Sequence, residues 1–422
     1  MDSNVYSKYV KILKEELVPA MGCTEPIAIA YATAKAKEAL GEQAVSAELF
    51  VSGNIVKNAK SVTVPHTGGL RGIKAAFAAG LVAGDAEKEL EVISAVKEEE
   101  LPLIREASEN FNVTVSVPLH ARVFDITVVL HSTGHTARVR IADRHTNVVL
   151  IEKDGETLFS REFEEEHEKE DRSVLNVRDI VRFADELNVE DVKEILDRQI
   201  EYNMAIAEEG LRGDYGANIG KTYLRSYQPD IKTTAKAYSA AGSDARMGGC
   251  ELPVVINSGS GNQGLTASIP VIVYARGLQL PSEALYRALC ISNLITIHLK
   301  SGLGTLSAYC GAVSAGAGAG CGVAYLLRGG YEEIAHTLVN ALAVDSGIIC
   351  DGAKASCAAK IATAVESGLL GLNMFYNGNQ FIAGDGIVKR GVEETIKSVS
   401  RLAQEGMRET DKEIIKIMLE VN

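Results

Sequence analysis

Residues 113–152, VTVSVPLHARVFDITVVLHSTGHTARVRIADRHTNVVLIE, form the clearest β region of the chain. Apolar and polar residues alternate along this stretch, and turn-forming residues interrupt it at 132–134 (Ser-Thr-Gly) and 142–144 (Ala-Asp-Arg). Alternation broken by such turns is typical of antiparallel strands, and about three or four strands fit the stretch. From about residue 175 onward the pattern is helical nearly to the end, so the sheet is confined to the first half.

The segments before the β region show both helical and strand patterns. Apolar residues recur with helical spacing over 4–17 and 26–40, whereas residues 47–65 alternate as a strand does. A helix of small residues is predicted over 70–82, and a charged helix over 85–109.

The sequence therefore predicts an α+β fold. Residues 1–45 and 185–422 would form a mainly α-helical body. Residues 46–180 would form an inserted α/β domain that contains an antiparallel sheet.

Composition and charge exclude several classes of protein. With 46% apolar and 23% charged residues, the 422-residue chain is typical of a globular protein rather than a disordered, collagenous or coiled-coil one. Its net charge of −13 disfavours binding to the phosphate backbone of nucleic acids. The absence of tryptophan and an aromatic content of 5% leave little for stacking on bases, so no nucleic-acid partner is predicted.

Cysteine content and the N-terminal residues indicate the compartment. Charges interrupt the N-terminal segment, so no secretory signal is predicted, and seven cysteines, an odd number, favour a reducing cytoplasm. Residues 301–327 carry no charge and are long enough to span a membrane, but they are mostly Gly, Ala and Ser. We expect a buried helix pair there and no membrane partner, although these helices could equally form the interface of a homo-oligomer.

Local context separates the cysteines. Cys290 lies in an apolar helical run and Cys321 in the Gly/Ala-rich stretch, so both are expected in the core, whereas Cys250 is ambiguous. Cys350 and Cys357 flank a polar segment, and their spacing of seven puts both on one face if the segment is helical. The pair matches no zinc or ferredoxin motif, so the spacing alone names no metal.

Cys23 lies in the segment Gly-Cys-Thr-Glu-Pro at 22–26, directly before a predicted helix. Thr24 or Glu25 would cap this helix, and Pro26 would occupy its first turn. The positive end of the helix dipole favours a thiolate, which could act as a nucleophile or as a base. A buried turn cysteine is the alternative, and no nearby histidine points to a Cys–His pair.

A glycine-rich loop, residues 257–264 (Asn-Ser-Gly-Ser-Gly-Asn-Gln-Gly), follows a short apolar run. It contains the G-x-G-x-x-G pattern of dinucleotide sites, but Pro270 stands where the following helix should run, and no βαβ alternation surrounds it. We interpret the loop as a nest whose backbone N–H groups, with the amides of Asn262 and Gln263, bind a carboxylate. A plain structural turn is the alternative.

Two further loops and one lysine offer hydrogen-bond donors. Residues 52–54 (Ser-Gly-Asn) are followed by Lys57 and Asn58, and residues 65–69 (Pro-His-Thr-Gly-Gly) form a tight turn. Lys300 precedes the uncharged stretch and could meet a carboxylate. Each feature alone is more readily explained as structural or solvent-facing.

Five motifs, taken together and in order, make the chain recognisable. They are GCTEP at 22–26, SGN with KN at 52–58, SGSGNQG at 258–264, LK followed by TLSAYCG at 299–311, and ICDGAKASCAAK at 349–360. Through these motifs the chain resembles the L-cysteine desulfidase family, which is similar to the catalytic α part of the iron–sulfur L-serine dehydratases. The resemblance covers nearly the whole chain.

The resemblance implies a lyase that does not use pyridoxal phosphate (PLP). L-Cysteine would undergo β-elimination to aminoacrylate and so yield pyruvate, ammonia and sulfide. It also implies a [4Fe–4S] cluster in the helical body, held by Cys310, Cys350 and Cys357 with one iron open, and Cys23 as the base. An open iron would polarise the bond to the leaving sulfur or oxygen, and soft thiolates suit iron.

The small amino-acid substrate is expected on the polar loops, from motif location and residue type. Its carboxylate would lie on the 258–264 nest, with Lys300 and the 54–58 loop nearby. The expected substrate-binding residues are Thr24, Glu25, Asn54, Lys57, Asn58, Thr67, Ser258, Ser260, Asn262, Gln263 and Lys300.

Three alternatives stay open at the level of sequence. An L-serine dehydratase would use the same site, and the shared motifs do not decide between the two substrates. A non-catalytic ligand-binding protein could keep the fold without the chemistry. A zinc protein could use the same thiolates, and would then bind zinc tightly and show no visible colour.

Overall fold

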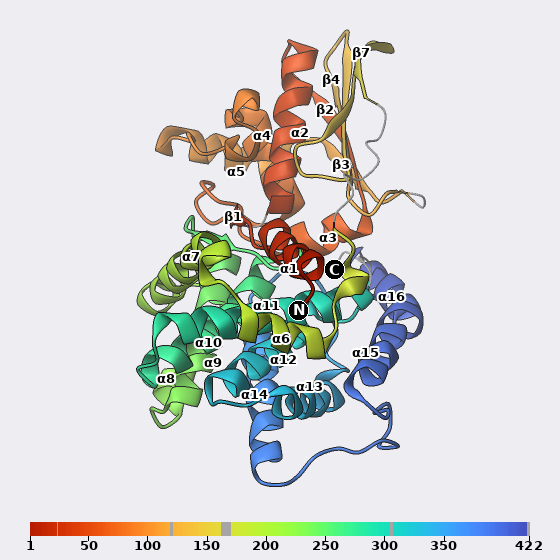
Figure 1. Ribbon diagram of the computed structural model, residues 1–422. Helices are drawn as coiled ribbons and strands as arrows, with labels where there is room; N and C mark the ends of the chain where they lie inside the picture. The colour runs from red at the N-terminus through yellow and green to blue at the C-terminus, as the bar shows by residue number, and fades with distance from the viewer. Residues whose placement is uncertain (23, 119–120, 162–169, 304–306, 420–422) are drawn as a thin grey trace.

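The computed structural model describes residues 1–422 except 23, 119–120, 162–169, 304–306 and 420–422. Helices and a mixed sheet form one lobe, and a larger helical body forms the other (Figure 1). The expected α+β fold is confirmed.

The strands are β1 (Pro19–Met21), β2 (Ser46–Val51), β3 (Val113–Ser116), β4 (Asp125–His131), β5 (Thr136–Ala142), β6 (Val148–Lys153), β7 (Glu156–Ser160) and β8 (Pro253–Val255). The α-helices are α1 (Ser3–Glu16), α2 (Thr24–Leu40), α3 (Gly53–Ala59), α4 (Gly72–Ala83), α5 (Leu101–Asn110), α6 (Val177–Glu186), α7 (Lys193–Arg212), α8 (Ile219–Ser226), α9 (Ile231–Met247), α10 (Gly261–Gly277), α11 (Ser282–Leu303), α12 (Gly311–Leu326), α13 (Tyr331–Asp345), α14 (Cys357–Tyr376), α15 (Val392–Arg401) and α16 (Arg408–Leu419).

The sheet has the strand order β3-β2-β4-β5-β6-β7. All neighbours are antiparallel except β2 and β3, which run parallel. The strands predicted over 113–152 are β3 to β6, and β7 is a strand that the prediction missed. The turn between β6 and β7 holds Asp154 and Gly155 with φ of 52° and 83°, so an Asp-Gly hairpin signal was present in the sequence.

Two other predictions near the sheet are wrong in detail. The strand expected over 47–65 ends at Val51, because Ser52 caps α3 by accepting a hydrogen bond from the amide of Ile55 at 3.4 Å. Of the charged helix expected over 85–109, only α5 is α-helical, and short 3₁₀ turns precede it at 86–91 and 98–100.

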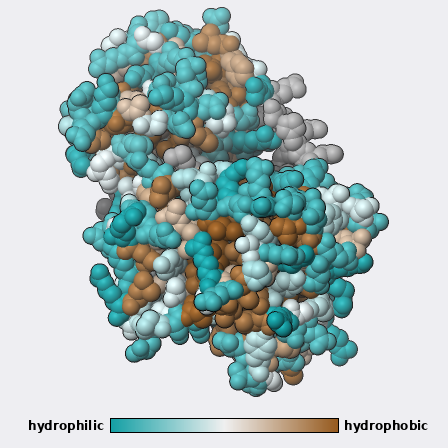
Figure 2. Space-filling view, turned by 60° about the vertical axis from the view of Figure 1, so that its left-hand side comes forward, coloured by the Kyte–Doolittle hydropathy of each residue, from teal (hydrophilic) through white to brown (hydrophobic). Residues whose placement is uncertain are grey.

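The two largest clusters of buried apolar residues lie one in each lobe. The sheet cluster includes α2, which packs across β4, β5 and β6, while α1 joins the cluster of the helical body. Packing thus assigns residues 24–40 to the sheet lobe, whereas the predicted division at residue 45 put them with the body. Figure 2 shows the two lobes in outline, with hydrophobic residues gathered on one face of the body. A homo-oligomer stays a prediction.

The Gly/Ala-rich segment becomes α12, the central helix of the body. A Cβ built on Gly316 would lie 2.3 Å from the carbonyl oxygen of Ala364 in α14, and one on Gly318 would lie 2.6 Å from that of Ser292 in α11. Small residues therefore let three helix backbones touch and fix the starts of α12 and α14 relative to each other. Within the described residues, none of the helices is long and apolar enough to cross a membrane.

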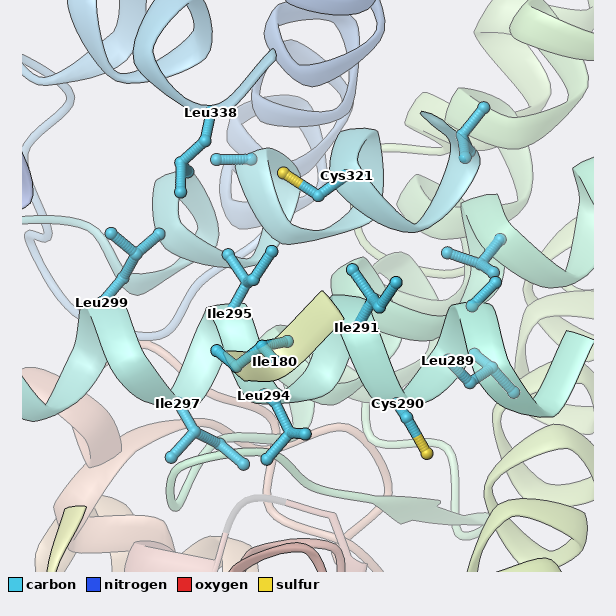
Figure 3. Packing of buried hydrophobic residues seen from close by; sticks show 14 of the residues in the cluster. Ile180, Leu289, Cys290, Ile291, Leu294, Ile295, Ile297, Leu299, Cys321 and Leu338 are labelled. Carbon is cyan, nitrogen blue, oxygen red and sulfur yellow. The ribbon is translucent and has the colours of Figure 1, made fainter. Parts of the chain in front are cut away.

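Two of the cysteines belong to this packing. Cys290 in α11 and Cys321 in α12 are fully buried among aliphatic side chains, as their sequence context predicts (Figure 3). Cys250 is also buried.

Candidate functional site

A cavity of about 290 Å³ lies where the two lobes meet. The sheet lobe contributes the first turn of α2 and the helix α3, and the helical body contributes the segments that precede α10, α12 and α14. The cavity brings together nearly all the predicted site residues: Thr24, Glu25, Asn54, Lys57, Asn58, Ser258, Ser260, Asn262, Gln263, Lys300, Cys310, Cys350 and Cys357.

The backbone holds the three cysteines at this cavity. Tyr309 and Ile349 pair in an isolated antiparallel bridge, and the amides of Cys310 and Cys350 donate across it at 3.1 and 2.5 Å to carbonyl oxygens of the opposite segment. Because alternate residues of an extended pair share a face, the two cysteines lie on the same face, opposite to Tyr309 and Ile349. Cys357 is the first residue of α14.

Burial and neighbouring charges shift the pKa values of two of the three thiols. Burial, together with the charge of Cys350, raises the pKa of Cys310 to about 12, and burial also raises the pKa of Cys357. Lys360 faces both of these thiols and opposes the shifts. Burial lowers the pKa of Lys300, although Cys350 and Cys310 counteract it. Burial therefore favours the neutral form of Cys310 and Cys357, and Lys300 and Lys360 lie beside the thiols, where they would stabilise thiolate charge.

The described His, Cys, Asp and Glu side chains include no group of three or more that could hold one metal ion. A zinc site needs all its ligands on a single ion, whereas each thiolate of an iron–sulfur cluster binds a different iron. Thiolates such as those of the three cysteines that line this cavity serve as ligands in both kinds of site.

The loop 257–264 has the backbone of a nest. Ser258 and Gly259 adopt φ of 50° and 76°, and Ser260 caps α10 by accepting from the amide of Gln263 at 3.4 Å. Contrary to expectation, α10 runs through Pro270. The dinucleotide interpretation fails for another reason: β8 before the loop has three residues and pairs antiparallel with β1, so no βαβ unit exists there.

Helix α3 ties the cavity to distant parts of the chain. The ammonium of Lys57 pairs with Asp411 of α16, and the carbonyl oxygen of Lys57 accepts from the amide of Ala353 at 3.1 Å. The side-chain amide of Asn58 donates to Oδ1 of Asn54 at 3.3 Å. Lys57 was expected near the substrate carboxylate. It does line the cavity, but its ammonium is already paired with the carboxylate of Asp411.

Among the predicted residues that the structure describes, Thr67 is the one that does not line the cavity, and Cys23 lies outside the described residues. Thr67 is buried away from the cavity, and its hydroxyl donates to the carbonyl oxygen of Val64 at 2.7 Å. Next to Cys23 in sequence, the hydroxyl of Thr24 lies 2.8 Å from Nε2 of His145, a histidine whose pKa is lowered by burial and which the sequence did not connect with this region.

Sequence reasoning also missed four polar residues of the lining: Arg246, Ser307, Tyr309 and Lys360. Lys360 lies within the recognised motif at 349–360 and Tyr309 within that at 299–311. The motifs therefore placed both residues near the site but indicated no role for them. For Arg246 the one available signal was a charge near the end of an otherwise small-residue helix.

Comparison with known proteins gives the family of the chain. The family model described as serine dehydratase alpha chain matches residues 87–416. A UPF0597 protein of Desulfitobacterium hafniense is 56% identical over 98% of this chain and 97% of its own length. UPF0597 proteins of Lachnoclostridium phytofermentans and Treponema denticola are 51% and 45% identical, over 98% and 99% of this chain and 100% and 99% of their own lengths. The chain belongs to the serine dehydratase alpha-chain family.

Proposed function

We propose that this protein is a PLP-independent, iron–sulfur-dependent lyase that converts L-cysteine to pyruvate, ammonia and sulfide. The observation that carries the proposal is the shared cavity of Cys310, Cys350 and Cys357, three residues from two separate segments. Membership in the serine dehydratase alpha-chain family supports a lyase of this general kind.

The residues fit a thiolate-bound iron–sulfur group in donor type and surroundings. Three thiols face one cavity, with Lys300 and Lys360 beside them to balance the negative charge of thiolates. When bound, the cluster would supply an open iron that acts as a Lewis acid on the leaving sulfur or oxygen. The described cysteines are free thiols, which suits the reducing cytoplasm that we include in this proposal.

The chain itself would bind and deprotonate the amino acid. The nest at 258–264 lies on the same cavity as the thiols and offers backbone amides to the substrate carboxylate. Cys23 would take the Cα proton while the bond from Cβ to sulfur breaks, and the resulting aminoacrylate would hydrolyse to pyruvate and ammonia.

L-Serine dehydration at the same site is the second candidate, favoured by the description of the matching family. The two reactions differ in the leaving group and share the carboxylate, the ammonium and the Cα proton.

Anaerobic assays decide between these candidates. Protein reconstituted with iron and sulfide is incubated with L-cysteine or L-serine, and pyruvate is quantified for both, with sulfide for L-cysteine. We expect pyruvate from L-cysteine at the higher kcat/KM, unaffected by hydroxylamine, which traps PLP. Faster turnover of L-serine would select the dehydratase, and no pyruvate from either substrate in iron-loaded protein would leave the non-catalytic alternative.

A further inference from the structure

A buried arginine outside the recognised motifs lies beside the nest. The side chain of Arg246, in the last turn of α9, is 9% exposed and lines the cavity. Its Nε has no hydrogen-bond partner, and Nη1 donates only a long bond, 3.5 Å, to Oδ1 of Asn262. Within the described part of the chain, the guanidinium forms no ion pair. A buried cation without a counter-charge is unfavourable, so this position calls for an anion.

The start of α10 is shaped around this guanidinium. A Cβ built on Gly261 would lie 2.4 Å from Nε and 2.9 Å from Cζ of Arg246, so any larger residue would displace the side chain. Gly261 is also the first residue of α10, whose positive end favours the same charge as the arginine does.

An acceptor without a hydrogen-bond partner lies in the first turn of α10, two residues after Gly261. The side chain of Gln263 is 6% exposed, lines the same cavity, and has an Oε1 atom without a hydrogen-bond partner. A Cβ on Gly311 would lie 2.6 Å from its Cδ, so the amide rests against the start of α12, next to Cys310. A buried acceptor without a donor is complementary to an ammonium group.

We propose that Arg246 binds the α-carboxylate, and that Oε1 of Gln263 accepts a hydrogen bond from the α-ammonium, of a free α-amino acid. This inference rests on the proposed function and names the residues that define its substrate class. It moves Gln263 from the carboxylate, where the sequence put it, to the ammonium. Amino-acid amides would be excluded because they lack the carboxylate, and peptides because no single Cα in them carries both a free carboxylate and a free ammonium.

L-Alanine tests this inference without turnover, because it has both charged groups and no leaving group. Its affinity for the full-length, cluster-loaded protein is measured by calorimetry beside L-alaninamide, which lacks the carboxylate, and propionate, which lacks the ammonium. Arg246→Gln is expected to lower the affinity for L-alanine at least tenfold and to leave the affinity for L-alaninamide unchanged. Gln263→Leu is expected to lower the affinities for L-alanine and L-alaninamide at least fivefold and to leave the affinity for propionate unchanged. Gln263→Glu is expected to retain L-alanine binding.

Two further variants control for folding and for charge. Arg276→Gln, exposed near the end of the same helix α10, is expected to change none of the affinities. Arg246→Lys keeps the charge without the planar fork, so it should keep part of the preference for L-alanine over L-alaninamide.

The inference and the proposed function fail in different ways. The expected binding pattern without pyruvate formation from L-cysteine or L-serine would refute the reaction and keep the inference. The inference is overturned if the parent protein binds L-alanine no better than the two analogues, or if Arg246→Gln leaves the affinity for L-alanine unchanged. Equal weakening of all three ligands by Arg246→Gln would overturn it as well.

Discussion

The ammonium of Lys57 lies 2.5 Å from a carboxylate oxygen of Asp411, although the two residues are 354 positions apart. Both are buried, with 5% and 7% of their surfaces exposed. The pair joins α3, which lines the cavity, to the C-terminal helix α16. A buried charge pair therefore links a residue of the cavity lining in the sheet lobe to α16.

Removing one partner of this pair should be strongly destabilising. Asp411→Ala leaves a buried cation unpaired, and we expect a loss of about 3–5 kcal/mol in the free energy of unfolding, measured with urea. Glu413→Ala on the same helix removes an exposed partner of Lys416 and should cost less than about 1 kcal/mol. Similar losses for both variants would show that the buried pair has no special role.

Gly352 should tolerate no side chain. Its φ is +92°, and a Cβ there would lie 2.0 Å from the carbonyl oxygen of Lys57. Gly352→Ala must move the segment that carries Cys350 away from α3, so we expect at least about 2 kcal/mol of destabilisation and reduced iron binding. Gly347→Ala, where a Cβ meets nothing within 4 Å, is the matched control and should be nearly neutral. Normal iron content in Gly352→Ala would contradict this account.

Asp345 should make stability depend on pH. Burial raises its pKa from 3.8 to about 6, so between these values the folded state holds a proton that the unfolded state has released. Stability from this carboxyl is present below pH 4 and is lost as pH rises through 6, by up to about 3 kcal/mol. Asp345→Asn should remove this decline in urea unfolding between pH 4 and 7, whereas Glu332→Gln, exposed on the same helix, should keep it. An unchanged slope in Asp345→Asn would refute the assignment.

Cys23 should affect turnover and not the cluster. We expect Cys23→Ala to keep the visible absorbance of the reconstituted protein while pyruvate formation is abolished, because the base is lost and the ligands remain. Retained turnover would mean that another group removes the Cα proton.

The sequence predicted which residues gather at one cavity better than it predicted the details of the fold. The recognised motifs singled out Cys310 and Cys350 as site residues. The structure places both on one face of the bridge between Tyr309 and Ile349, a pairing that no local sequence pattern reveals. Helix α3 was missed because its seven residues, 53–59, are too few to show a helical repeat of apolar positions, so the cap at Ser52 decided its conformation.

Long-range pairing limited the rest of the prediction. Nothing near Lys57 in sequence indicates Asp411, since the pair exists only once the lobes and α16 have packed. Thr67 fitted the residue type expected of a binding loop, but its hydroxyl satisfies a backbone carbonyl instead. Pro270 was taken as a helix breaker, yet α10 continues through it, and the proline is buried.

Iron bound per chain after anaerobic reconstitution tests the central claim most directly. We predict about four irons in the parent protein and a large loss in each of Cys310→Ala, Cys350→Ala and Cys357→Ala. The core variants Cys290→Ala and Cys321→Ala should keep the parent iron content, because both thiols are fully buried in the helical packing. Parent-level iron in all three cavity variants would contradict the assignment of these cysteines as ligands.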